Sequence, residues 1–157
     1  MSTHDRVAAL VRHYYWDRDL NCARTTLRCL ENMLQEPLHP QVYTAVAGCH
    51  GAGGTGGQCG LVEGGLLLIA LRGAELGKEE SEIVDLCARY STQFTERYGS
   101  ISCKDLRPGG IHPNDPPHLC ELVSVDAICF LHDFLDEMTQ SAEPNRRKSG
   151  FADDTAE

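Results

Sequence analysis

The sequence has no long hydrophobic run and no recognisable secretory signal. A membrane-spanning helix needs about 18 or more consecutive apolar residues, whereas the longest uncharged apolar stretch here runs from Gly64 to Leu71. The N-terminal segment, MSTHDRVAALVRHYYWD, mixes charged and apolar residues, so it lacks the uninterrupted apolar centre of a signal peptide. These absences predict a cytoplasmic protein without a membrane partner.

Positive charge is scarce. The chain has 14 Lys and Arg against 23 Asp and Glu, which gives a formal net charge of −9. Binding to a nucleic-acid backbone requires concentrated Lys and Arg. The only basic cluster here is Arg146-Arg147-Lys148, close to the C-terminus. We therefore expect no nucleic-acid partner.

Several cofactor motifs are also missing. The cysteines form neither CxxC nor CxxCH, so closely paired zinc ligands and covalent haem attachment are not expected. A GxGxxG pattern does occur from Gly51 to Gly56, but no Gly-Lys-Ser/Thr follows it, and the segment after Gly73 reads as another charged helix. A dinucleotide-binding fold would need a second strand there. The glycines therefore do not indicate a nucleotide site.

The sequence does contain helical patterning along most of its length. Its 157 residues, of which 41% are hydrophobic, are enough for one domain with one core. Apolar residues recur at helical spacing, and the expected helices lie near 7–14, 20–34, 40–47, 61–71, 79–98 and 118–138. We predict an all-α domain over residues 1–140, a single bundle of five to six helices, and a disordered tail over 141–157.

The stretch GCHGAGGTGGQCG, from Gly48 to Gly60, interrupts this helical pattern. Glycine permits backbone conformations with positive φ, so we expect residues 51–57 to form an exposed loop at one end of the bundle. A plain loop does not explain the cysteines inside this stretch. Cys49 and His50 could add ligands to a metal, or Cys49 could offer a second thiol to Cys59; equally, both could be ordinary loop residues.

Eight cysteines are the most unusual feature of the composition. In a chain without a secretory signal, thiols commonly serve as metal ligands, redox groups or buried small side chains. Four of them flank the ends of predicted helices: Cys22, Cys59, Cys103 and Cys120. Cys59 precedes a helix, where unpaired N–H groups and the helix dipole favour the thiolate, so it is the candidate reactive thiol. Within predicted helices, Cys29, Cys87 and Cys129 lie on apolar faces and are predicted to be core residues.

The same four cysteines carry a resemblance to a known family. Asn21-Cys22-Ala23, then Cys59-Gly60-Leu61-Val62-Glu63-Gly64, Tyr98-Gly99-Ser100-Ile101-Ser102-Cys103 and a late Cys120 resemble the family named for its C, GCAxxG, C, C pattern. Leu61 stands where the family motif has alanine. The resemblance covers roughly residues 20–135 and implies an all-α redox-active protein in which these four cysteines are the functional thiols.

Three kinds of function follow for these thiols. Four thiolates from separate elements satisfy the usual ligation of an iron–sulfur cluster, which predicts electron transfer or redox sensing with Cys22, Cys59, Cys103 and Cys120 as the cofactor and metal ligands. The alternatives are metal-free thiol–disulfide chemistry at Cys59 and a structural zinc site in an interaction module. The leading function requires a redox partner protein, and the sequence leaves open both a homo-oligomer and turnover of a substrate.

Overall fold

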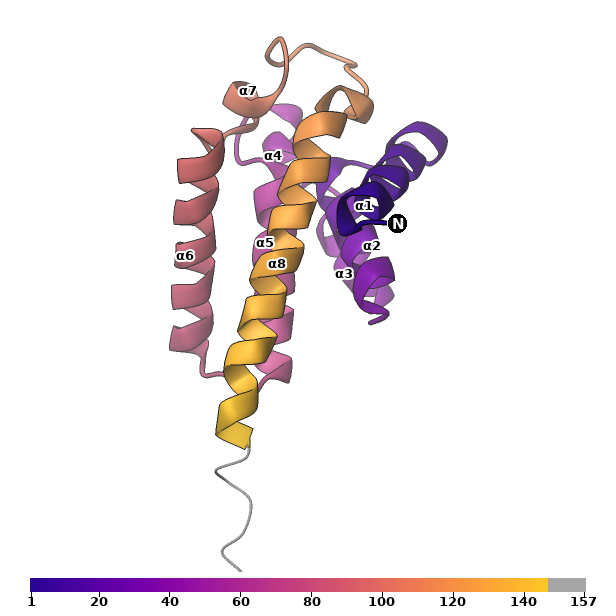
Figure 1. Cartoon of the computed structure of the whole chain (residues 1–157). Coiled ribbons are helices and arrows are strands. Elements are labelled where there is room, and N and C mark those ends of the chain that lie inside the picture. Colours follow the sequence, from indigo (N-terminus) through magenta and orange to yellow (C-terminus); the bar gives the residue numbers. More distant parts are fainter. Residues whose placement is uncertain (147–157) are drawn as a thin grey trace, which may run out of the picture.

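The computed structural model describes residues 1–146 (Figure 1). These residues form eight α-helices and no strand, which confirms the all-α prediction. The bounds are α1 Thr3–Arg12, α2 Cys22–Leu34, α3 Pro40–Ala45, α4 Gly51–Gly54, α5 Gly60–Glu75, α6 Glu80–Tyr98, α7 Cys103–Leu106 and α8 Glu121–Arg146. A π-helical turn, η1 (His13–Asp17), follows α1, and a 3-10 turn, η2 (Pro117–Cys120), precedes α8. The tail predicted over 141–157 lies outside the described residues from position 147 onward.

The predicted number of five to six helices was too low. The two additional helices are α4 and α7, which have four residues each. Single turns of this length carry no apolar periodicity, so the sequence does not reveal them. The α4 turn is irregular, because Ala52 and Gly53 inside it have φ of 52° and 73°. Residues 52–55 are exposed and Gly51 and Gly56 are buried, so only the tip of the glycine-rich stretch is an exposed loop.

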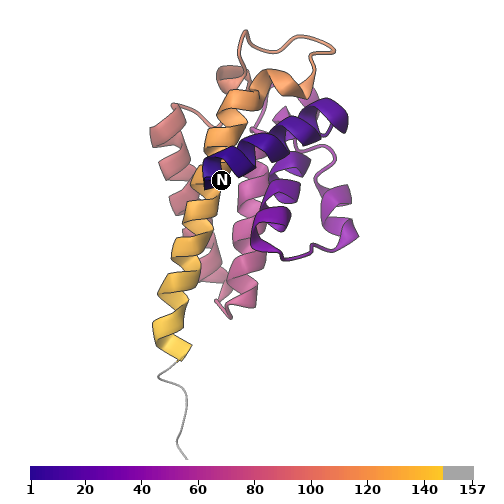
Figure 2. The ribbon, with the colours of Figure 1, turned by 45° about the vertical axis from the view of Figure 1, so that its right-hand side comes forward.

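The long helices α5, α6 and α8 run side by side, and α1, α2 and α3 cover another side of the bundle (Figure 1). Figure 2 shows α1 lying across α8, with which it is in contact. The short helices α4 and α7, the proline-rich loop (residues 107–116) and η2 gather at one end, where α5 and α8 begin and α6 ends. Of the described helices, none is both long and apolar enough to cross a membrane.

Local signals explain where the helices begin and end. The Asn21 side chain accepts a hydrogen bond from the Arg24 N–H at 2.9 Å and caps α2. Glu79 and Glu82 form a reciprocal capping box at the start of α6. The same helix ends at Gly99, whose φ of 83° is the left-handed conformation that glycine adopts without strain. These ends agree with the helices expected from the sequence.

Helix α5 extends beyond the range 61–71 expected from the sequence and continues through Gly73 to Glu75. The helix is buried on several sides, and its glycines face its neighbours at close range. A Cβ atom on Gly73 would lie 2.7 Å from Cγ1 of Ile83 in α6, and one on Gly64 would lie 3.1 Å from Cβ of Thr26 in α2. Glycine serves here for close helix packing, which offsets its low helix propensity.

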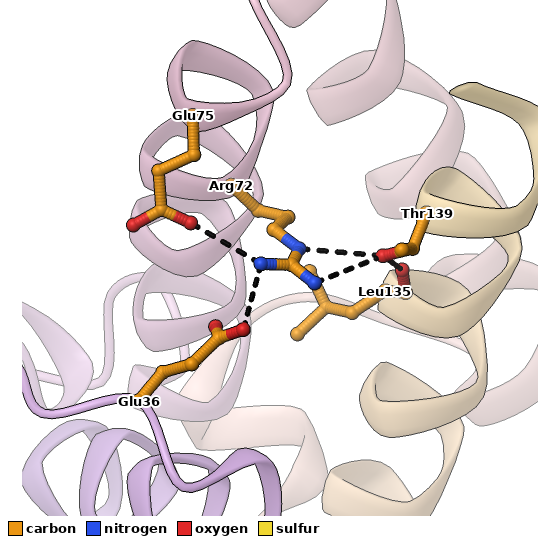
Figure 3. Close-up of polar contacts among 5 residues, drawn as sticks. All are labelled: Glu36, Arg72, Glu75, Leu135 and Thr139. Atoms are coloured by element: carbon orange, nitrogen blue, oxygen red, sulfur yellow. Dashed lines mark hydrogen bonds and ion pairs between the residues drawn. The ribbon is translucent and has the colours of Figure 1, made fainter. Parts of the chain in front are cut away.

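Arg72 links α5 to two other parts of the fold (Figure 3). It lies in the last turn of α5, at the end of the helix away from α4 and α7. Its Nη1 is 2.8 Å from Oε1 of Glu36, which follows α2, and 3.3 Å from Oε2 of Glu75. Its Nε and Nη2 both donate to Oγ1 of Thr139 in α8, at 3.3 and 3.2 Å. The Thr139 hydroxyl in turn donates to the Leu135 carbonyl at 3.0 Å.

Replacing Gly65 by Ala should destabilise the bundle. The added Cβ would lie 2.7 Å from Cε1 of Tyr90 and 2.8 Å from its hydroxyl oxygen, and Tyr90 is fully buried and has no room to move. We expect a loss of about 1–3 kcal/mol in the free energy of unfolding, measured by urea denaturation. Gly48→Ala is the control, because nothing lies within 4 Å of a Cβ there, and its effect should stay within about 0.5 kcal/mol. Equal stability of the two variants would contradict the close α5–α6 packing.

Candidate functional site

The structure brings Cys22, Cys59, Cys103 and Cys120 together around one cavity of about 1000 Å³. The cavity lies at the end of the bundle that holds α4, α7 and η2 (Figure 1). Each cysteine occupies the boundary of an element: Cys22 is the first residue of α2, Cys59 is the N-cap of α5, Cys103 opens α7 and Cys120 closes η2. Residues far apart in the sequence thus meet at a single site.

A short antiparallel contact places Cys59 beside Cys103. Gln58 and Ser102 form an isolated β-bridge. On either side of it, the Cys59 N–H donates to the Ile101 carbonyl at 2.8 Å and the Cys103 N–H donates to the Gly57 carbonyl at 2.7 Å. The two cysteines are therefore held by backbone hydrogen bonds, which do not depend on the neighbouring side chains.

Two glycines allow the backbone to lie directly against the sulfur atoms. Gly51 has φ of 68°, and a Cβ on it would lie 3.0 Å from Sγ of Cys103. At Gly60 a Cβ would collide with Sγ of Cys22 and with the carbonyl oxygen of Cys49. Larger residues at either position would displace a cysteine. This explains in physical terms why positions 51 and 60 are glycine.

The thiols of Cys22 and Cys59 shift each other's pKa in opposite directions. Hydrogen bonding from the Cys22 thiol is the largest cause of the lowered pKa of Cys59. The backbone N–H groups of Leu61 and Val62, at the start of α5, lower it further, whereas burial and the charge of Glu63 act in the opposite direction. The same hydrogen bond, together with burial, raises the pKa of Cys22 well above its usual range. Cys59 is therefore the favoured thiolate of the pair.

The other two cysteines are held as neutral thiols. Burial raises the pKa of Cys103, and it raises the pKa of Cys120 to about 11 even though the Arg107 guanidinium opposes this shift. Arg107 Nη1 lies 4.0 Å from the Cys120 sulfur. Arg107 also donates from Nη2 to the Pro116 carbonyl at 3.0 Å and lies 3.5 Å from the Asp115 carboxylate. Through these contacts the proline-rich loop is tied over the cavity.

The four cysteines line one cavity but do not form a ready-made site for a single metal ion. Among the described residues, no group of three or more His, Cys, Asp or Glu side chains is arranged to hold a single metal ion. A structural zinc ion needs four ligands at about 2.0–2.3 Å from one centre. The described side chains thus form no such four-ligand centre, while the thiols that line the cavity are donors of the kind that bind zinc and iron–sulfur clusters.

Sequence reasoning missed several residues next to the cysteines. Tyr15, in the π-helical turn, is buried, and its hydroxyl is 2.6 Å from the Ser124 hydroxyl. Burial and then the charge of Cys22 raise the pKa of Tyr15, and those of Cys120 and Cys59 add to this effect, so its phenol borders the site. No motif marks Tyr15, because only the packing of η1 against α8 brings it there. The same holds for Arg107, because its sequence context, rich in proline and glycine, indicates only a surface loop.

The remaining cysteines lie apart from the cavity. Cys29 is fully buried, as predicted, whereas Cys87 and Cys129 pack against the core but are only half-buried. His50 lines the cavity. Cys49 faces Glu63 instead, and burial followed by a hydrogen bond to this carboxyl raises its pKa to about 11. Of the ambiguous pair, therefore, His50 is the residue that faces the four-cysteine site.

Comparison with known proteins agrees with this geometry. The family model described as "Putative redox-active protein (C_GCAxxG_C_C)" matches residues 20–134, a span that includes all four cysteines of the cavity. The chain belongs to this family. No curated protein and no solved structure matches the chain.

Removing the thiol of Cys22 should raise the pKa of Cys59. In Cys22→Ala the donor to the Cys59 thiolate is lost, so the charged form is less stabilised. We expect the pH profile for alkylation of Cys59 by iodoacetamide in the metal-free protein to move to higher pH. Cys22→Ser keeps a hydroxyl donor and should shift the alkylation profile of Cys59 less. Near neutral pH, wild-type Cys59 should be alkylated before Cys87 and Cys129, whose pKa values burial raises. An unchanged profile in Cys22→Ala would rule out the hydrogen-bonded pair.

Proposed function

We propose that this chain is a redox protein that binds an iron–sulfur cluster through Cys22, Cys59, Cys103 and Cys120. The observation that carries the proposal is that four thiols from four separate elements line one cavity of about 1000 Å³. Four cysteine thiolates are the usual ligands of both 2Fe–2S and 4Fe–4S centres. Because a cluster has several iron atoms, its ligating sulfurs lie further apart than those around one zinc ion. Zinc modules generally supply their cysteines in close pairs, which this chain lacks, so four single thiols from separate elements favour a cluster over zinc.

The surroundings of the sulfurs also support this function. Three of the four thiols have raised pKa values, so they would need a strongly cationic group to become thiolates. Arg107, at 4.0 Å from the Cys120 sulfur, adds one positive charge against the negative charge of the ligands. When bound, a cluster supplies one-electron oxidation and reduction. The role of the protein would be electron transfer or redox sensing.

A redox partner protein would need access to the site, and the flank of Cys120 offers it. Leu119 and Leu122, on either side of Cys120 in the sequence, are 40% and 87% exposed. Trp16, which stacks on His118 with ring centroids 3.9 Å apart, is 52% exposed. Exposed apolar groups in one region are typical of contact surfaces. We propose that the redox partner contacts this flank.

Anaerobic purification should yield coloured protein with iron and acid-labile sulfide. We expect Cys59→Ser to abolish the visible charge-transfer bands and the bound iron, because a cavity ligand is lost. Cys129→Ser is the matched control: Cys129 lies outside the cavity, and the variant should retain both. Zinc without colour would support the structural-site alternative. Loss of the bands in both variants, or in neither, would contradict ligation by these four cysteines.

Metal-free thiol–disulfide exchange is the second candidate, and one observation favours it. In the Cys22–Cys59 pair, hydrogen bonding from the neighbouring Cys22 thiol lowers the pKa of Cys59. In such exchange the Cys59 thiolate attacks one sulfur of a disulfide substrate, a thiolate leaves, and Cys22 then resolves the mixed disulfide. The protein loses two hydrogens and the substrate gains two. Cys59 is the attacking residue and Cys22 the resolving one.

This candidate is tested by oxidising the metal-free protein with glutathione disulfide. We expect a mass decrease of two hydrogens and a Cys22–Cys59 crosslink in the peptide map. In Cys22→Ser the mixed disulfide of Cys59 with glutathione should accumulate instead, because nothing resolves it. If metal-free protein forms no such crosslink, while anaerobically purified protein carries iron and sulfide, the cluster function stands alone.

A further inference from the structure

A second cavity, of about 540 Å³, lies between η1, the start of α2, and α3, and none of the four site cysteines lines it. We propose that it binds a small molecule through a phosphate or carboxylate group. Its walls include Arg18, Arg24 and Arg28, together with the aromatic rings of Tyr14 and Tyr43. This proposal does not depend on the redox function.

Two of the three arginines in the cavity wall have no ion-pair partner among the described residues. Although Asp and Glu outnumber Lys and Arg by 23 to 14, no ion pair of Arg18 or Arg24 occurs in the described part of the chain. Arg28 is paired with Glu31 at 2.9 Å. The Glu31 carboxylate also accepts a hydrogen bond from the Leu38 N–H at 3.0 Å, so its charge is already stabilised by Arg28 and the Leu38 N–H. Two guanidinium groups remain for an anion.

Arg24 and Arg28 are held in place before any ligand arrives. Arg24 and Arg28 are four residues apart on α2 and share one face of the helix. Arg24 Nε donates to the Tyr43 carbonyl at 3.1 Å, and the Arg28 guanidinium lies 3.7 Å from the centre of the Tyr43 ring. His13, also in the wall, is fixed by Asp17 at 2.8 Å. A site organised in this way loses little side-chain entropy on binding.

The chemistry of the donors defines the class of ligand. The single side-chain hydrogen bond of Arg24 uses Nε, which leaves its two terminal nitrogens for the two oxygens of a phosphate or carboxylate. The cavity volume of about 540 Å³ exceeds what one such group fills, so the ligand has further atoms that lie against Tyr14 and Leu20. Nucleic acid does not fit, because the surrounding chain has a net charge of −9.

Isothermal titration calorimetry of the intact protein at low ionic strength tests the proposal. Two probes are used, pyrophosphate and succinate. We expect at least one probe to bind at millimolar or lower concentration, and the tighter probe identifies phosphate or carboxylate as the recognised group. Arg24→Gln and Arg18→Gln should each weaken binding by about tenfold, because each removes a charged donor. Added salt should weaken binding as well.

Arg89→Gln is the matched control, since Arg89 lies on α6 outside the cavity and carries the same charge. The Arg89→Gln variant should bind both probes with the same affinity as the wild type. Arg18 is exposed, so Arg18→Gln leaves the fold intact even if Arg24→Gln disturbs the contact with Tyr43. Absence of binding for both probes, or equal binding by Arg18→Gln and Arg89→Gln, would overturn the proposal.

Discussion

The close approach of α5 to α2 is the constraint on which the rest of the site depends. Gly60 and Gly64 present no side chain toward α2, so the first turn of α5 lies against Cys22, Ala23 and Thr26. This contact sets Cys59 beside Cys22. The chain before α5 then pairs with the chain before α7 and brings Cys103 alongside. Arg107 links the end of α7 to Cys120, so one helix contact organises the positions of all four sulfurs.

This arrangement removes four thiols from water at one site, which is unfavourable in free energy. Burial raises the pKa of Cys103 and Cys120, and hydrogen bonding with Cys59 followed by burial raises that of Cys22. The pKa of Cys59 is lowered because Cys22 and the start of α5 donate to it. A site built from distant segments exists only in the folded chain, so a group bound there stabilises the fold and is lost when the fold opens. Chemistry at the sulfurs and stability of the bundle are thus linked.

Much of the fold and the grouping of the cysteines could be predicted from the sequence, because local chemistry determines them. The long helices follow from apolar periodicity, from the caps at Asn21 and Glu79 and from the left-handed conformation of Gly99. The four cysteines form a recognisable set because each lies at the boundary of an element. The continuation of α5 through Gly73 could not be predicted, because it depends on Ile83 of another helix. The sequence did not reveal Tyr15, Arg107 or the contact between Arg24 and Tyr43 for the same reason. Each acquires its role through tertiary contacts that no spacing in the sequence encodes.

The stacking of Trp16 on His118 has a practical consequence. Trp16 is the only tryptophan of the chain. Its indole ring lies 3.9 Å from the His118 ring, and its N–H donates to Glu121 at 2.7 Å. These two neighbours lie on either side of the segment that carries Cys120. The molecule therefore contains its own optical reporter: a displacement of that segment changes the environment of the indole, and its fluorescence can follow events at the sulfur site without any added label.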